Sequence, residues 1–148
     1  MVKSKRHLLS YLAGVFDGEG CISISRKRSY QKGETKLPIY YDVRLTVQMT
    51  DPSIPRLFLS VFGGSTCVWM DKKRTRPIYR WALTATKCGE AIKELMPYTI
   101  LKRPQMEVAL SFLTKMHKRG KCHKLSNDDI ALRQADYILM RKLKEQIL

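Results

Sequence analysis

The chain has 148 residues, of which 44% are hydrophobic, so it can bury the core of one globular domain, which we expect to span residues 1–148, and is no disordered tail. Its 28 lysines and arginines outnumber 13 acidic residues, and the net charge of +15 favours a polyanionic partner, with nucleic acid ahead of an anionic membrane or a structural RNA. No apolar run approaches the roughly 20 residues of a membrane-spanning helix, and no cleavage site follows the basic start, so we expect an intracellular protein without a membrane partner.

The cysteines are scattered, and no two pairs of cysteine or histidine stand at the spacing of a zinc site. Free thiols in a reducing compartment are therefore expected. Cys21, the first of them, is expected to pack rather than to react. The four positions are Cys21, Cys67, Cys88 and Cys122.

Helical periodicity over residues 8–18 predicts a first helix, which runs into the stretch LAGVFDGEG at 12–20. Two segments that alternate between apolar and polar side chains follow, at 21–28 and 40–49. A polar connection containing glycine and proline separates them. This arrangement predicts two half-buried strands paired as a hairpin.

A short helix is predicted next, with Asp51 as its N-cap, Pro52 in its first turn and two glycines, 63–64, as its end. A second hairpin follows, with strands at 65–71 and 78–84 joined by KKRTRP. We expect the large apolar side chains of this hairpin to lie in the core beneath it. These are Trp69, Tyr79, Trp81 and Leu83.

Three further helices are predicted: one over residues 86–95, a longer one from Pro104 to about Lys118, and a last one from Ser126 or Asn127 onward. The basic segment KRGKCHKLS separates the last two. The order helix, hairpin, helix, hairpin and helices predicts an α+β fold, in which the helices pack on one face of an antiparallel sheet.

The other face of that sheet is predicted to carry hydrogen-bonding and basic side chains. Polar residues alternate on any solvated sheet, but the net charge favours an interface with nucleic acid, where such side chains address base edges in the major groove. The first hairpin contributes Ser23, Ser25, Lys27, Ser29, Asp42, Arg44, Thr46 and Gln48. The second hairpin contributes Lys72, Lys73, Arg74, Arg76 and Arg80.

One face of the first helix is almost without side chains, because Ala13, Gly14 and Gly18 are spaced about one turn apart. Such a face lets two backbones approach closely, and its partner would be the same helix of a second copy around a twofold axis. Glu19 would then meet its symmetry mate, and two carboxylates there call for cations such as Mg²⁺. The ordinary alternative is an amphipathic helix with a glycine stop and an exposed glutamate.

The stretch LAGVFDGEG resembles the signature of the LAGLIDADG homing endonucleases. The positions that carry the family's residue, or its acidic alternative, are Leu12, Ala13, Gly14, Asp17, Glu19 and Gly20. The order of hairpins and helices after the motif is also similar to that family, and MPYTILKRPQ resembles its segment with a proline, an aromatic residue and a lysine, here Lys102. The likeness covers roughly residues 8–113.

This resemblance implies an αββαββα fold with further C-terminal helices, whose antiparallel sheet forms a saddle on DNA. A single motif implies a homodimer on a long, roughly palindromic duplex. The implied activity is site-specific cleavage of both strands across the minor groove, which leaves 3′ overhangs. The dimer interface implied by the motif comprises Leu12, Ala13, Gly14, Phe16, Asp17 and Gly18.

The resemblance also implies a divalent-metal centre. Glu19 and the backbone carbonyl of Gly18 would hold Mg²⁺ or Mn²⁺, and Ca²⁺ would bind without supporting cleavage. Lys102 would lie beside the water that attacks the phosphate, and Asp51 or Gln48 would organise that water. Many members have glutamine where this chain has Asp51, so this residue either serves the water or only caps its helix.

Two rival functions stay open at this point. The same fold serves non-catalytic DNA-binding regulators and maturases that fold an intron RNA, and fold alone does not decide function. A basic, structural RNA-binding protein is the second rival, and it would need neither a twofold dimer nor the glycine face. The expected setting is bacterial, phage or organellar.

Overall fold

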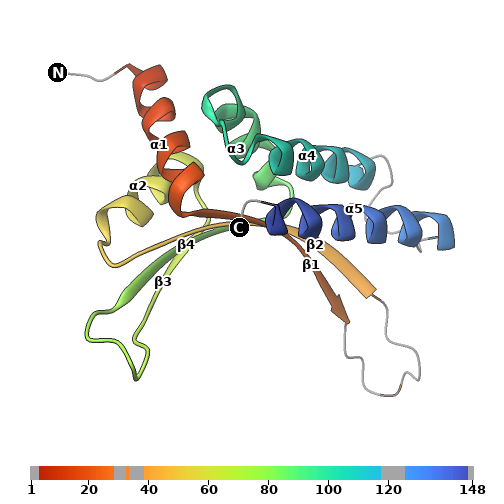
Figure 1. Cartoon of the computed structure of the whole chain (residues 1–148), viewed down its shortest axis with the longest axis horizontal. Coiled ribbons are helices and arrows are strands. Elements are labelled where there is room, and N and C mark those ends of the chain that lie inside the picture. Colours follow the sequence, from red (N-terminus) through yellow and green to blue (C-terminus); the bar gives the residue numbers. More distant parts are fainter. Residues whose placement is uncertain (1–3, 29–32, 34–38, 118–125, 147–148) are drawn as a thin grey trace.

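The structure, a computed structural model, describes residues 4–28, 33, 39–117 and 126–146 (Figure 1). The elements follow the predicted order, and most boundaries agree within three residues. They are α1 (Lys5–Glu19), β1 (Gly20–Arg28), β2 (Ile39–Met49), α2 (Ser53–Phe62), β3 (Ser65–Trp69), β4 (Ile78–Thr84), α3 (Lys87–Leu95), the 3₁₀ turn η1 (Met96–Tyr98), α4 (Arg103–His117) and α5 (Asn127–Glu145).

The two hairpins form one antiparallel sheet with the strand order β1-β2-β4-β3, which confirms the predicted α+β class. All the helices lie on one side of this sheet, and the other side is uncovered (Figure 1). The sheet bends into an arch, so that the two hairpins descend on either side and the uncovered face is concave. This is the saddle that the sequence resemblance implies. Among the described helices, none combines the length and the apolar content of a membrane span.

The strand register places apolar and polar residues on opposite faces of the sheet. Trp81 and Leu45 face the helices and are at most 2% exposed, whereas Gln48 lies opposite Arg80 on the concave face. The indole nitrogen of Trp81 donates to the carbonyl of Gly63 at 2.7 Å, which satisfies its polar group within the core. Burial of the apolar face therefore fixes which side chains the concave face presents.

Trp69 corrects one prediction. It was expected in the core, but it pairs with Ile78 in the sheet and is half-buried on the concave face, beside Arg80. The run Cys-Val-Trp-Met has no alternation, so periodicity does not assign its faces. The pairing with β4 assigns them instead.

The glycines of α1 and its end have two distinct explanations. A Cβ atom on Gly20 would lie 2.5 Å from the Phe16 ring, so the fold itself requires glycine where α1 passes into β1. A Cβ atom on Gly14 or Gly18 would meet nothing within 4 Å. Packing inside the described part of the chain therefore leaves these two glycines unexplained, although glycine costs a helix about 1 kcal/mol relative to alanine.

Helix α5 is held against both α4 and the sheet. Its start carries a capping box between Ser126 and Asp129. Its middle is tied to α4 by an ion pair between Lys115 and the buried Asp136, at 3.0 Å. The hydroxyl of Tyr41 in β2 donates to the amide oxygen of Gln134 at 2.5 Å. These contacts fix where the C-terminal turn of α5 lies.

Candidate nucleic-acid interface and catalytic centre

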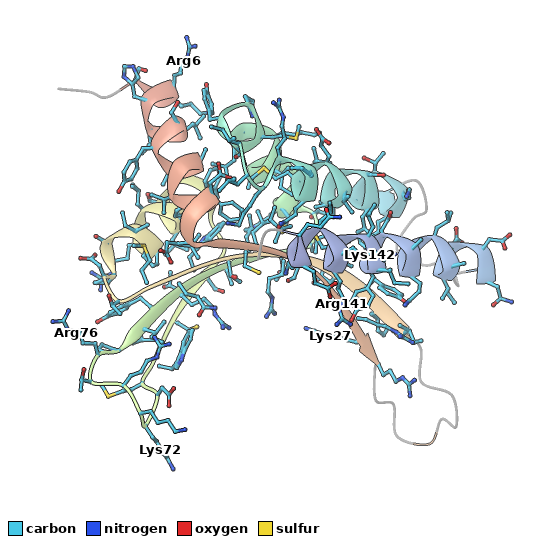
Figure 2. The ribbon with its side chains drawn as sticks, in the orientation of Figure 1. Arg6, Lys27, Lys72, Arg76, Arg141 and Lys142 are labelled. Carbon is cyan, nitrogen blue, oxygen red and sulfur yellow. The ribbon has the colours of Figure 1, made fainter. Side chains whose placement is uncertain are left out.

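The concave face gathers the residues predicted to contact nucleic acid. In β1 and β2, Ser23 lies opposite Arg44, and Ser25 lies opposite Asp42. Figure 2 shows Lys27 on the β1 limb of the arch and Lys72 at the tip of the β3–β4 hairpin. Positive charge therefore lines both limbs. Ser29, which was also predicted for this face, lies outside the described residues.

Arg80 is held in place at the centre of this face. Its guanidinium carbon lies 4.5 Å from the centre of the Trp69 ring, a stacking geometry that favours arginine. With its amide oxygen turned toward Arg80, Gln48 accepts from Nε at 3.1 Å and from Nη2 at 2.9 Å. The remaining N–H groups of the guanidinium are left for a ligand. This arrangement suits bidentate hydrogen bonding to the major-groove edge of guanine.

A cavity of about 480 Å³ opens where α1 meets the sheet. It brings Glu19 and Gln48, which were both predicted to be catalytic, into one lining. Thr46 and Arg74, which were predicted to contact DNA, belong to the same lining. The full lining is Glu19, Cys21, Thr46, Gln48, Met49, Thr50, Arg74 and Ile78.

Glu19 is the last residue of α1, and its side chain is exposed. Within the described residues its carboxylate has neither a hydrogen-bond donor nor an ion-pair partner. Gly18 precedes it in the last helical turn, where backbone carbonyls have no intrahelical N–H partner. A free carboxylate beside such carbonyls is the kind of oxygen donor set that hard divalent cations prefer.

The described residues of one chain do not complete a metal site by themselves. No group of three or more histidine, cysteine, aspartate or glutamate side chains is close enough there to hold a metal ion. Glu19 therefore fits a divalent ion only where further ligands come from outside the chain, such as a second copy of Glu19 or phosphate oxygens.

Asp17 does not face the cavity but anchors the loop before α4. Its carboxylate accepts the backbone N–H groups of Ile100 at 2.8 Å, Leu101 at 3.2 Å and Lys102 at 3.0 Å. The Lys102 ammonium donates in turn to the backbone carbonyl of Asp17. Residues more than 80 positions apart in the chain are thereby joined, and Lys102 is fixed at the end of α1, next to Glu19.

Lys102 is half-buried, and its surroundings shift the pKa of its ammonium group. Burial lowers the pKa of its ammonium below the ordinary lysine value, whereas the carboxylates of Asp17 and Glu19 act in the opposite direction. The positive charge of Lys144 adds to the lowering. Two lysines and two carboxylates thus share one electrostatic neighbourhood at the end of α1.

Asp51 points elsewhere. Its carboxylate accepts the backbone N–H of Ser53 at 2.7 Å and also the Ser53 hydroxyl, at the start of α2. The hydroxyl and then the N–H of Ser53 lower the pKa of this carboxyl. Asp51 is outside the cavity lining. The N-cap position of α2 is held by Pro52, and not by Asp51 as was predicted, so Asp51 fixes the first helical residue, Ser53, from one position farther out.

The residues predicted for a dimer interface divide into two groups. Leu12, Ala13 and Phe16 are fully buried in the core of the chain itself, so their side chains pack inward and are not available to a partner. Gly14 and Gly18 are exposed. Beside the end of α1, the loop bound by Asp17 exposes two large apolar side chains, Ile100 at 82% and Leu101 at 58%.

The sequence profile of the LAGLIDADG endonucleases matches residues 12–103. The chain belongs to the LAGLIDADG endonuclease family. The match spans the motif helix, both hairpins and the loop that carries Lys102. No curated protein has a sequence that matches this chain.

Solved structures of homing endonucleases share the fold of this LAGLIDADG protein. I-CvuI in complex with its target has a TM-score of 0.67 and 22% identity, over 94% of this chain and 81% of that chain. The archaeal intron-encoded I-Vdi141I, complexed with DNA, has a TM-score of 0.72 and 12% identity, over 95% of this chain and 86% of that chain. The meganuclease I-SmaMI, bound to uncleavable DNA, has a TM-score of 0.64 and 18% identity, over 89% of this chain but only 44% of that chain.

Sequence reasoning missed three residues of this LAGLIDADG centre. Cys21 was expected to pack rather than to react, but it is exposed on the concave face opposite Thr46, and the alternation of Ile22 and Ile24 already indicated that face. Trp69 was assigned to the core. Lys144 had no signal, because α5 meets β1 only through the tertiary fold.

We expect Asp17→Asn to lower the free energy of unfolding by about 2 kcal/mol, because an amide replaces a charged acceptor of three N–H groups. Asp71→Asn is the matched control, since Asp71 is exposed and its carboxylate accepts the N–H of Lys73 in a turn. That variant is expected to change stability by less than about 0.5 kcal/mol. Urea unfolding at equal protein concentration measures both values, and equal losses would contradict the anchoring role of Asp17.

Proposed function

We propose that this chain is a homodimeric, Mg²⁺-dependent endonuclease that cuts both strands of a specific DNA duplex. The observation that carries the proposal is the free carboxylate of Glu19, which lies in the lining of the cavity that opens on the polar, concave face. A protein that only binds DNA has no use for an unpaired carboxylate facing phosphates, because like charges repel. A cation bound between the carboxylate and a phosphate would offset this repulsion.

The arch is the proposed DNA-binding surface. Its two limbs carry lysine and arginine side chains, and strands of this kind enter the major groove (Figure 2). The family resemblance implies that cleavage takes place across the minor groove between the two half-sites and leaves 3′ overhangs. I-CvuI, I-Vdi141I and I-SmaMI, which share the fold, were each solved with DNA.

The proposed partner across the twofold axis is a second copy of this chain. Gly14 and Gly18 present bare backbone that the described residues do not cover, and Ile100 and Leu101 expose apolar surface beside it. A symmetric contact of the α1 helices would cover all four. I-SmaMI, of which this chain spans 44%, has the length of about two such units. A twofold dimer implies a long, roughly palindromic target.

At the centre of the dimer, Glu19 of each chain and the Gly18 carbonyl would hold the divalent ions. When bound, Mg²⁺ polarises the scissile phosphate and makes a bound water a better nucleophile. In the proposed hydrolysis, the water oxygen forms a bond to phosphorus and the bond to the leaving sugar oxygen breaks. The water gives one proton to solvent, and the leaving oxygen takes up one proton from solvent to become a hydroxyl group. Mn²⁺ is expected to support the reaction, and Ca²⁺ to allow binding without cleavage.

The remaining side chains of the centre position the reactants. Lys102, fixed by Asp17, places an ammonium group where it steadies a phosphate oxygen or orders the attacking water. Gln48 lines the same cavity as Glu19, and with its oxygen on Arg80 its amide N–H groups remain for water or phosphate. Asp51 is given an indirect part, since it fixes the start of α2.

The test is cleavage of a randomised duplex library with Mg²⁺ by the unaltered protein, by Glu19→Gln and by the control Glu107→Gln. Glu107 is exposed on α4, outside the cavity. We expect specific cuts by the unaltered protein and by Glu107→Gln. For Glu19→Gln we expect a loss of at least about 10³-fold, because a metal ligand is removed.

Two outcomes would contradict the endonuclease. Selection of one duplex without cleavage by the unaltered protein, in Mg²⁺ or Mn²⁺, would indicate a DNA-binding regulator with this fold. Preference for a structured intron RNA over any duplex would indicate a maturase. Sequencing the bound and the cut fractions of the library separately decides the first outcome, and competition of the selected duplex with a structured intron RNA decides the second.

The dimer gives a second prediction. Gly14→Leu is expected to abolish dimerisation and cleavage, because its side chain has free space in the single chain but would fill the space of the second helix. Ser111→Leu adds the same side chain to an exposed position of α4 and should remain dimeric. Sedimentation velocity of both variants decides, and a dimeric Gly14→Leu protein would refute the proposed interface.

A third prediction concerns base recognition by Arg80. Arg80→Lys keeps the charge but loses the planar fork, so one position in each half-site should lose its preference for guanine by about 1–3 kcal/mol. Lys72→Ala, at the hairpin tip, should weaken all sequences equally. Binding selection in Ca²⁺ measures both effects. An unchanged sequence preference in Arg80→Lys would exclude this reading of Arg80.

A further inference from the structure

The last turn of α5 contacts one residue of the cavity lining, Cys21, from the far end of the chain. The Lys144 ammonium donates to the sulfur of Cys21 at 3.3 Å, across 123 positions of sequence. Cys21 is the second residue of β1 and lines the cavity together with Glu19. The C-terminal helix, which the sequence left without a role, therefore brings a positive charge to the proposed catalytic centre.

The position of Lys144 differs from that of its basic neighbours. Arg141 and Lys142 are exposed on the same part of α5 and are labelled in Figure 2, whereas Lys144 is half-buried. Any of the three would offset the negative end of the helix dipole. The dipole therefore accounts for basic residues in this turn, but not for the direction in which Lys144 points.

The hydrogen bond that holds Lys144 is a weak one. A thiol sulfur is a poor acceptor, so the ammonium gives up little when it exchanges this partner for an anionic oxygen. Burial is the main cause of the lowered pKa of the Lys102 ammonium, and the positive charge of Lys144 makes a smaller contribution in the same direction. Two ammonium groups, one from the loop before α4 and one from α5, therefore lie near the end of α1, on Asp17 and on Cys21.

We propose that Lys144 is a phosphate-binding residue of the catalytic centre, whose ammonium leaves Cys21 for an oxygen of the phosphate at or next to the cut. This assignment rests on the proposed endonuclease. It gives α5 a direct part in the reaction: the contacts of Gln134 and Asp136 dock the helix, and its last turn delivers the lysine. In the dimer, each copy would supply one Lys144.

The test compares Lys144→Met, Lys144→Arg and the control Lys142→Met. Methionine keeps most of the side-chain length without the charge, and Lys142 is two residues away on the exposed side of the helix. Single-turnover cleavage in Mg²⁺ gives the rate, and binding in Ca²⁺ at several salt concentrations gives the number of phosphates contacted. Circular dichroism shows that each variant is folded.

We expect Lys144→Met to cleave about 10²-fold more slowly, as when one charge-stabilising donor is removed from an active site. The slope of log Kd against log salt should fall by about 2, because each of the two subunits loses one phosphate contact. Lys144→Arg should recover most of both values. Lys142→Met should match the unaltered protein.

Two results would overturn the assignment. One is a Lys144→Met protein that cleaves and binds like Lys142→Met. The other is a Lys144→Arg protein that is folded but as impaired as Lys144→Met, since a phosphate contact tolerates either cation. If the unaltered protein binds one duplex without cutting it, the endonuclease fails, and the salt dependence still decides whether Lys144 contacts phosphate. A protein that binds no duplex would refute both.

Discussion

The structure of the centre depends on one carboxylate, that of Asp17. It accepts the N–H groups of Ile100, Leu101 and Lys102, and so binds the end of α1 to the loop before α4. This contact places Lys102 beside Glu19 and turns two apolar side chains outward next to the bare face of α1. Hydrogen bonds from three backbone N–H groups to one charged carboxylate are among the stronger polar contacts in proteins. They can therefore hold this loop in place although its side chains are exposed. The position of Lys102 and the proposed dimer surface both follow from where this carboxylate lies.

Successive residues of the motif then have separate duties. Phe16 fills the core, Asp17 anchors the loop, Gly18 leaves the helix face bare, Glu19 enters the cavity, and Gly20 makes room for the Phe16 ring. Three of these five residues, Phe16, Asp17 and Gly20, serve the structure of the single chain, whereas Gly18 and Glu19 do not. Gly14, one turn earlier, is like Gly18. Some residues weaken a helix and make no stabilising contact within their own chain. Such residues are explained by contacts with a second copy of the chain or with a ligand. That contrast is the main physical argument for the proposed dimer and for the proposed activity.

The sequence predicted the fold because both hairpins alternate with period two and their connections carry glycine and proline, and because proline or glycine punctuates most of the helices. It also predicted the concave face, since burial of Val43, Leu45 and Trp81 leaves no choice for the residues between them. The sequence did not predict positions that hydrophobic periodicity leaves unassigned. Trp69 stands in an apolar run, and its face is set by pairing with β4. Lys144 meets Cys21 only because α5 folds back over β1, and no local pattern encodes a contact between residues so distant in sequence.

Gln48 joins the two activities that the structure supports. Its oxygen holds Arg80, which presents its guanidinium to the groove, and its side chain lines the cavity that contains Glu19. In the proposed endonuclease, a base that displaces Arg80 also removes the partner that orients Gln48, and the disturbance reaches the centre through a single side chain. Binding loses one base contact in that case, whereas cleavage loses the contact and the alignment of the cavity as well. Cleavage should therefore discriminate between bases at this position more strongly than binding does, because geometry at a reacting centre is worth more than the contact alone.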